Sequence, residues 1–148
     1  MNISLATLDD IPDLCRLLGY LFELEAEFTP EIQLQQRGLK AIIESPQSGT
    51  ILVSREQGRP VGMVSLLYSI STALGGRVCT LEDMVVEPDK RGSAIGSELL
   101  SHAIDYAREQ GVKRITLLTD HDNAAAQQFY QRQGFVLSPM VAMRTMIT

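Results

Sequence analysis

The residues best suited to chemistry lie around a short loop that contains glycine. An apolar, largely β-branched run at 84–86 ends just before Pro88, and a strong helical pattern begins near Ile95. The segment between them, residues 91–96, contains Gly92 and Gly96. The first N–H groups of a helix have no partner inside it, and the helix dipole adds partial positive charge there. A strand, a glycine loop and a helix in this order therefore predict a site for a phosphate or another anion.

A strand, two helices and an antiparallel hairpin are expected before this loop. Apolar residues alternate in the predicted strands and recur every three or four residues in the predicted helices. Turn residues, such as those at 57–60, separate the segments. The expected strands are 3–5, 50–55, 61–71 and 78–87, and the expected helices begin near Pro12 and at Thr29-Pro30.

The chain after the loop predicts a parallel crossover followed by a second, smaller motif. The expected elements are a helix at 95–110, a strand at 114–119, a helix from its cap Asn123 to Arg132, and a hairpin of 135–137 with 141–146. Two strands joined through one helix form a crossover, so 78–87 and 114–119 should be parallel neighbours. We expect residues 1–148 to form one α/β domain with a mixed, mostly antiparallel sheet.

The overall composition excludes several classes of protein. The 148 residues include 13 basic and 18 acidic side chains, a formal net charge of −5. This charge argues against general nucleic-acid binding, which needs a basic surface, and is compatible with a cationic partner. Cys15 and Cys79 show no metal or redox spacing, so we expect reduced thiols in a cytoplasmic protein. No apolar run is long enough for a membrane span, and no export signal is expected.

Residues 91–96 resemble the acyl-CoA-binding signature of the GNAT N-acetyltransferase superfamily. That signature is Arg or Gln, two residues, Gly, one residue, then Gly or Ala, at the start of a helix that follows a strand. Arg91 and Gly96 match it, and Gly92 is a frequent companion. Ala94 departs from it, because the family has its first signature glycine there. If this position required positive φ, alanine would cost about 1–2 kcal/mol.

A second stretch, residues 123–135, extends the resemblance. The family pattern is Asn, then Ala, then an apolar–Tyr pair, then Gly–Phe, and it is matched at Asn123, Ala126, Phe129, Tyr130, Gly134 and Phe135. The order of expected elements from Ile3 to Met146 is also similar to the GNAT fold. The resemblance implies a single-domain GNAT-like fold, in which a central parallel pair of strands splays to form an acyl-CoA cleft flanked by helices.

The resemblance also implies acetyl-CoA as a co-substrate, with no metal. In the family the pantetheine arm enters between the splayed strands and pairs with backbone as an extra strand. Met84 and Val86 would contact this arm, and the loop would hold the pyrophosphate. The implied cofactor-binding residues are Met84, Val85, Val86, Arg91, Gly92, Ser93, Ala94, Ile95, Gly96 and Asn123.

Direct acetylation of an amine needs three groups. An ammonium with a pKa of about 10.4 must lose a proton, the tetrahedral oxyanion needs a donor, and the departing thiolate benefits from an acid. A backbone N–H near Val85 could serve the oxyanion. By resemblance, Tyr130 is the acid and Glu82 is the base, directly or through a water. Asp83 and an ordered water chain are the alternatives to Glu82, and adjacent strand residues point to opposite faces, so at most one of the two carboxylates lines the cleft.

Two further sets of polar residues have both a structural and a functional interpretation. Asn123 is expected to cap the helix that follows it, and in the family this residue also bonds the pantetheine arm. Glu23, Glu25 and Glu27 lie near the end of the first helix, where the family builds its acceptor pocket. A charged helix face is usually only solvated.

The leading interpretation is an acetyl-CoA-dependent N-acetyltransferase that acts on a primary amine by direct attack. The alternative is a non-catalytic acyl-CoA-binding sensor or partner domain of the same fold, which the departure at Ala94 keeps open. A polyamine, a protein N-terminus, a lysine side chain, an amino acid and an aminoglycoside all fit as acceptors. The acidic run at 81–83 favours a small cationic amine. In this family exposed C-terminal strands often pair, which makes a homodimer the assembly to test.

Overall fold

The structure of the chain is a computed structural model that describes residues 2–24 and 31–148. It separates into two compact units, one ending at Leu117 and the other starting at Leu118. The expected helix start at Thr29-Pro30, together with Glu25 and Glu27, lies outside the described residues. The two units are described in turn.

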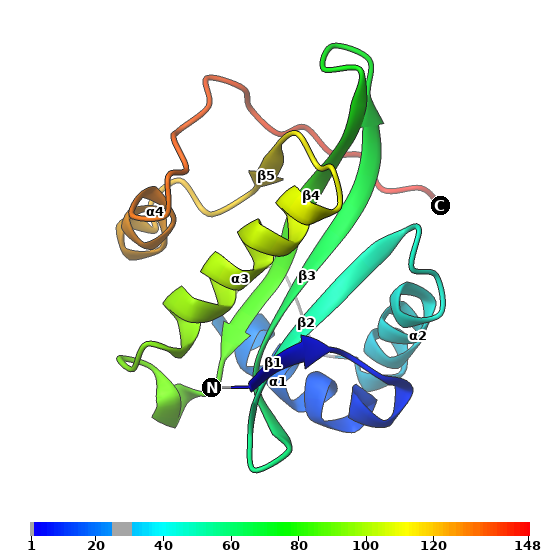
Figure 1. Cartoon of the computed structure of the whole chain (residues 1–148), viewed down its shortest axis with the longest axis vertical. Coiled ribbons are helices and arrows are strands. Elements are labelled where there is room, and N and C mark those ends of the chain that lie inside the picture. Colours follow the sequence, from blue (N-terminus) through cyan, green and yellow to red (C-terminus); the bar gives the residue numbers. More distant parts are fainter. Residues whose placement is uncertain (1, 25–30) are drawn as a thin grey trace. The chain divides into compact units, whose positions relative to one another are not determined.

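The first unit is built on a five-stranded mixed sheet with the strand order β1-β2-β3-β4-β5 (Figure 1). Its strands are β1 (Asn2–Leu5), β2 (Gly49–Glu56), β3 (Arg59–Ser71), β4 (Gly76–Val86) and β5 (Ile115–Leu117). The first four strands are antiparallel to their neighbours, and β4 pairs with β5 in parallel. The predicted hairpin and the predicted parallel crossover are therefore confirmed.

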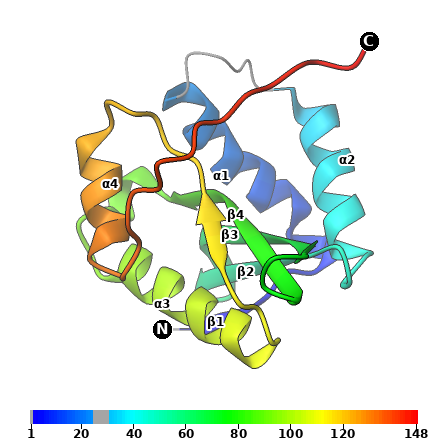
Figure 2. The same cartoon turned by 90° about the horizontal axis from the view of Figure 1, so that it is seen from above.

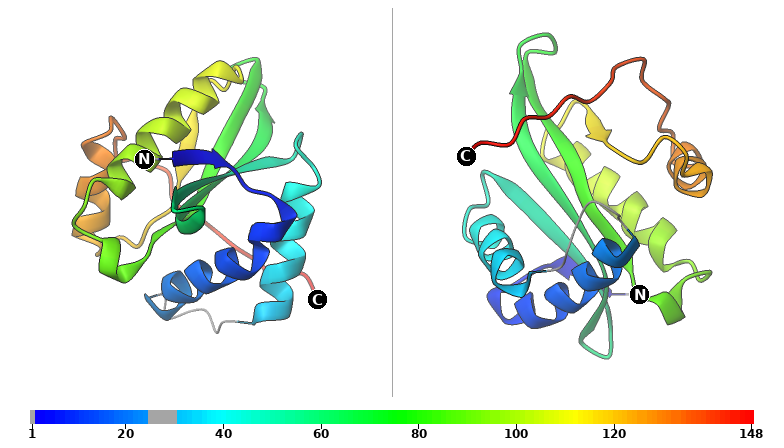
Figure 3. Two further views of the ribbon diagram at one scale, coloured as in Figure 1. Left: turned by 60° about the horizontal axis from the view of Figure 1, so that its bottom comes forward. Right: turned by 180° about the vertical axis from the view of Figure 1, so that it is seen from behind.

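Helices cover both faces of this sheet. Helices α1 (Ile11–Leu24) and α2 (Ile32–Ile43) lie together on one face, and α3 (Ile95–Glu109) lies on the other (Figures 2 and 3). The predicted apolar stripe of α1 is buried at Leu14, Leu17 and Leu18, which pack with Val85 of β4 in one core cluster. On the other face α3 buries Leu99, Leu100, Ala103 and Ala107.

Gly62 of β3 lies beneath the first turn of α3. A Cβ added there would lie 3.4 Å from Cδ2 of Leu99 and 3.5 Å from Cγ2 of Ile95, which are ordinary van der Waals contacts. A methyl group would therefore fit at this position, whereas a branched side chain would meet both residues of α3.

The second unit holds one helix, α4 (Ala124–Gln131). Asn123 caps it as predicted, because its Oδ1 accepts a hydrogen bond of 3.0 Å from the N–H of Ala126. The ring of Tyr130 packs edge-on against Phe129 and Phe135, with centroids 5.2 and 5.7 Å away.

The predicted final hairpin is wrong. Residues 135–148 are all described, and none of them forms a strand. Pro139 has no backbone N–H to donate, and the N–H of Met140 donates a local hydrogen bond of 3.1 Å to the Ser138 hydroxyl. A lone two-stranded hairpin is marginal in water without a third strand or a packed helix. As a result, β5 is the last strand of the described sheet.

No helix within the described ranges is long and apolar enough to cross a membrane.

A buried ion pair joins the start of the chain to β2. Asp10 is 7% exposed and accepts 2.7 Å hydrogen bonds from both terminal nitrogens of Arg55. It also accepts a 2.8 Å bond from the N–H of Thr7. The hydrogen bonds from Arg55 are the largest cause of the lowered pKa of Asp10, and they outweigh the opposing effect of burial.

We predict that this pair makes stability depend on pH. Because the folded pKa of Asp10 lies below its ordinary value of 3.8, its contribution is complete above that value and is lost as pH falls through the folded pKa. Asp10→Asn should lower the free energy of unfolding at pH 7 by about 2 kcal/mol. In urea titrations the gap between wild type and variant should shrink steadily as the solution is acidified. A gap that stays constant down to strongly acidic pH would contradict this assignment.

Candidate functional site

The main feature of the site is that β4 extends beyond the point where its pairing with β5 ends. The ladder joins Cys79–Leu81 to Ile115–Leu117 and then stops, whereas β4 continues to Val86. In the described part of the chain, no strand pairs with residues 84–86 on the side away from β3. Such an exposed strand edge presents backbone N–H and C=O groups to an extended ligand. Met84, Val85 and Val86, the predicted contacts of the pantetheine arm, lie on this edge.

A β-bulge occurs where the two strands part. Ser65 of β3 faces Glu82, but Met63 faces Val85, so two residues of β4 oppose one of β3. Asp83 occupies the bulge with a positive φ of 48°. The Ser65 hydroxyl fixes it by donating a 3.0 Å hydrogen bond to the carbonyl of Glu82. A bulge bends the strand and re-aims the side chains that follow it.

The bulge changes what was expected of the two candidate bases. Simple alternation along a strand would send Glu82 and Asp83 to opposite faces, but the extra residue interrupts that alternation. Glu82 is exposed, and Asp83 is half-buried with its Oδ2 3.5 Å from the Ser65 hydroxyl. The geometry therefore leaves Glu82 as the carboxylate with open access to solvent, and it keeps Asp83 next to β3.

The loop after β4 opens onto the first turn of α3. A short turn of 3₁₀ helix, Pro88–Lys90, leads to exposed residues 91–94, and Gly92 has a positive φ of 84°. Arg91 is held by a 3.2 Å hydrogen bond from its Nε to the carbonyl of Val86. Ser93 donates to the carbonyl of Lys90 at 2.5 Å. The loop is thus a folded turn that faces solvent.

Ala94 is the N-cap residue of α3, with φ −80° and ψ 2°. This backbone conformation carries no penalty for alanine, so the departure from the family signature causes no strain. Alanine has no side-chain oxygen to cap the helix. The Ile95 N–H donates a long hydrogen bond of 3.5 Å to the Ser93 hydroxyl. The amide of Gly96, next in the first turn, faces the side on which helix N-termini bind anions.

The remaining predicted residues, Asn123 and Tyr130, lie together on or beside α4 in the second unit. Oδ1 of Asn123 is used by the cap, which leaves its amide nitrogen as a donor. Burial raises the pKa of Tyr130 to about 12. A phenol with this pKa keeps its proton at neutral pH, which is the state required of a general acid.

The two cysteines are poorly suited to act as nucleophiles. Both cysteines are buried, and burial raises the pKa of Cys15 and brings that of Cys79 to about 11. Thiols of this kind form little thiolate at pH 7, and the thiolate is the nucleophile. Among the residues that the structure describes, no group of three or more His, Cys, Asp or Glu could hold a metal ion.

Sequence analysis missed one charged cluster beside the loop. Glu87 directly follows β4 and is 4% exposed, with two arginines on its carboxylate. The only local signal was an acidic residue between an apolar strand and Pro88. Its partners come from α1 and from the turn between β2 and β3, so no local pattern could identify them.

Comparison with known proteins gives this geometry a family. The sequence profile of the "Acetyltransferase (GNAT) family" matches residues 18–135, which include the strand, the loop and α4. The chain belongs to the GNAT family. The family predicted from the two sequence motifs is therefore confirmed, and so is the predicted α/β fold class.

Two relatives and one solved structure show the extent of the similarity. The chain is 33% identical over 135 residues to the uncharacterized N-acetyltransferase YhfO of Bacillus subtilis, covering 91% of this chain and 89% of that protein. It is 30% identical over 130 residues to aminoalkylphosphonate N-acetyltransferase of Salmonella typhimurium, covering 88% and 81%. A predicted acetyltransferase from Clostridium acetobutylicum, solved with acetyl-CoA, shares the fold at a TM-score of 0.80 and 16% identity, covering 97% and 95%. The family match and the two sequence relatives support acetyl transfer as the general chemistry of this GNAT chain, and the solved structure shows the shared fold.

We predict that the bulge is held by the residue type at position 83. Aspartate tolerates positive φ, whereas a β-branched residue does not. Asp83→Val should lower the free energy of unfolding by about 1–2 kcal/mol relative to Asp83→Asn. Thermal unfolding of the two variants tests this. Equal melting temperatures would mean that the backbone at position 83 is not strained by valine and that the bulge is misassigned.

Proposed function

We propose that this GNAT chain transfers an acetyl group from acetyl-CoA to a primary amine. One observation carries the proposal: the free edge of β4 beyond Leu81 runs straight into a glycine loop and an uncapped helix N-terminus. An extended thioester arm with a diphosphate at its end has this same order of parts. The pantetheine arm would add to residues 84–86, and the pyrophosphate would lie against residues 91–96.

The bond-making step needs a nucleophile, and we propose that it is the amine itself. Direct attack in a ternary complex fits the state of the two cysteines, because neither Cys15 nor Cys79 is exposed or readily ionised. The amine nitrogen attacks the thioester carbonyl, and a backbone N–H near Val85 donates to the oxyanion. Collapse of the intermediate breaks the C–S bond and yields the amide and the CoA thiolate.

Two side chains would manage the protons. Glu82, exposed at the bulge, would take the proton from the ammonium directly or through a water, with Asp83 or a water chain as the alternative. Tyr130 would donate a hydrogen bond to the departing sulfur and share its proton as the C–S bond breaks. A CoA thiol has a pKa near 8.5, so its thiolate would be stabilised by a donor that stays protonated at neutral pH.

The side chain of Asn123 would make two hydrogen bonds through different atoms. Its Oδ1 accepts the cap hydrogen bond from Ala126, and its amide nitrogen remains a donor for a carbonyl of the pantetheine arm. The cap and the contact with the cofactor therefore do not compete for one atom. One side chain could therefore fill both of the roles expected from the sequence.

For the acceptor we propose a small cationic amine. The formal net charge of −5 and the acidic pair at the bulge both favour a positively charged ligand. One relative is named aminoalkylphosphonate N-acetyltransferase, and this name supports a small amine as the acceptor. A panel of polyamines, amino acids, aminoalkylphosphonates, aminoglycosides and peptides, assayed by release of CoA thiol, tests the class. Binding of acetyl-CoA without turnover on any member would instead indicate a non-catalytic acyl-CoA sensor.

We predict a specific kinetic defect for Tyr130→Phe. Loss of the phenolic proton should lower kcat by about 10²-fold, in the range typical of a general acid, while acetyl-CoA affinity stays near that of wild type. Phe129→Leu is the matched control, because it alters the same aromatic cluster without removing a proton donor. Unchanged turnover in Tyr130→Phe would remove this residue from the mechanism.

A further inference from the structure

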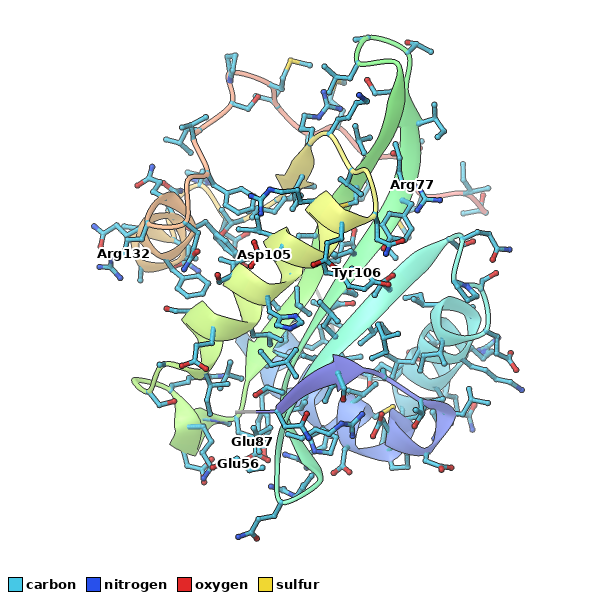
Figure 4. The ribbon with its side chains drawn as sticks, viewed as in Figure 1. Glu56, Arg77, Glu87, Asp105, Tyr106 and Arg132 are labelled. Carbon is cyan, nitrogen blue, oxygen red and sulfur yellow. The ribbon has the colours of Figure 1, made fainter. Side chains whose placement is uncertain are left out.

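Glu87 is a buried carboxylate that the proposed reaction does not use. Its side chain is 6% exposed and sits at the point where β4 ends and the phosphate-facing loop begins. Two guanidinium groups meet its Oε1: Arg16 from α1, and Arg59 from the start of β3 at 3.0 Å. Figure 4 shows Glu87 near Glu56, at the end of the sheet where β2 turns into β3.

Arg16 is itself fixed by further hydrogen bonds. Its Nη2 donates to the carbonyl of Pro60 at 2.9 Å and to Oδ1 of Asp13 at 3.3 Å. The carboxylate of Glu87 therefore connects three separate pieces of the first unit: helix α1, the β2–β3 turn and the end of β4. This carboxylate thus cross-links elements that are far apart in the sequence.

The backbone of the same residue holds the loop. Glu87 donates its N–H to the carbonyl of Val61 and accepts from the N–H of Lys90, both at 2.9 Å. Lys90 in turn forms an ion pair of 3.0 Å with Glu56 at the end of β2. The first turn after β4 is thus braced, whereas the loop residues at 91–94 are exposed.

We propose that Glu87 is a positioning residue for acyl-CoA binding. Its pairing with Arg16 and Arg59 fixes the end of β4, and this sets the distance between the free strand edge and the amides of α3. The strand edge and the amides of α3 must contact the two ends of an extended ligand at the same time. A small displacement of the loop would therefore lose the contacts at one end of the ligand. This inference rests on the proposed use of acetyl-CoA.

Simple electrostatics predicts the opposite effect for Glu87. A carboxylate near a site for a diphosphate repels the ligand, so its neutralisation should tighten binding. The positioning role predicts weaker binding on neutralisation, because the arginines lose the anion that holds them in place. The direction of the change in affinity therefore separates the two explanations.

The test is Glu87→Gln, measured by calorimetric titration with acetyl-CoA and by steady-state kinetics. We expect the Kd and KM for acetyl-CoA to rise about five-fold or more, with kcat at saturation close to that of wild type. Asp10→Asn is the matched control, because Asp10 is also a buried carboxylate on an arginine, but it is hydrogen-bonded to Thr7 and Arg55 rather than placed beside the loop. It should lose stability and keep wild-type affinity.

Each result decides one question. Unchanged or tighter binding in folded Glu87→Gln would overturn the positioning role and leave the proposed function intact. Failure of the wild-type protein to bind acetyl-CoA would overturn the proposed function itself, and the positioning role with it. If Glu87→Gln does not fold, Arg59→Gln replaces it, because this arginine is half exposed and Arg16 would still hold the carboxylate. Its weaker binding should persist at high salt, and a loss that vanishes with salt would contradict positioning.

Discussion

The structure depends on one interruption of hydrogen bonding: β4 pairs with β5 only as far as Leu81 and then continues alone. A strand edge without a partner can form backbone hydrogen bonds with another extended segment, and proteins normally cover or shorten such edges. Here the edge is short, begins at a bulge and ends at Pro88. These limits confine the unpaired edge to the few residues between Leu81 and Pro88, so no long strand edge is left open.

The rest of the first unit keeps this edge in place relative to the helix that follows. Gly62 lies against the first turn of α3, and Glu87 ties the end of β4 to α1 and to the start of β3. Both contacts act at the same junction from opposite faces of the sheet. As a result, the free backbone groups of β4 and the amides of α3 are fixed by separate contacts, and neither relies on the ligand for its position.

Local patterns predicted most of this arrangement, and long-range contacts account for what they missed. The apolar run at 84–86, Pro88 and the helical spacing after Ile95 are neighbours in sequence, so the strand, loop and helix could be read directly. The bulge at Asp83 could not, because its positive φ follows from the register with β3. The partner of Glu87 on α1 is 71 residues away in sequence. The final hairpin was expected from apolar runs, but none of the residues 135–148 forms a strand.

The central claim is that acetyl-CoA binds along β4 and onto the N-terminus of α3. Backbone NMR of the isotopically labelled wild-type protein, titrated with acetyl-CoA, tests this claim most directly. We expect the largest amide shift changes at residues 84–86 and 92–97, together with slower hydrogen exchange within 84–86. Shift changes confined to other parts of the chain, with the amides of β4 and the loop unmoved, would contradict it.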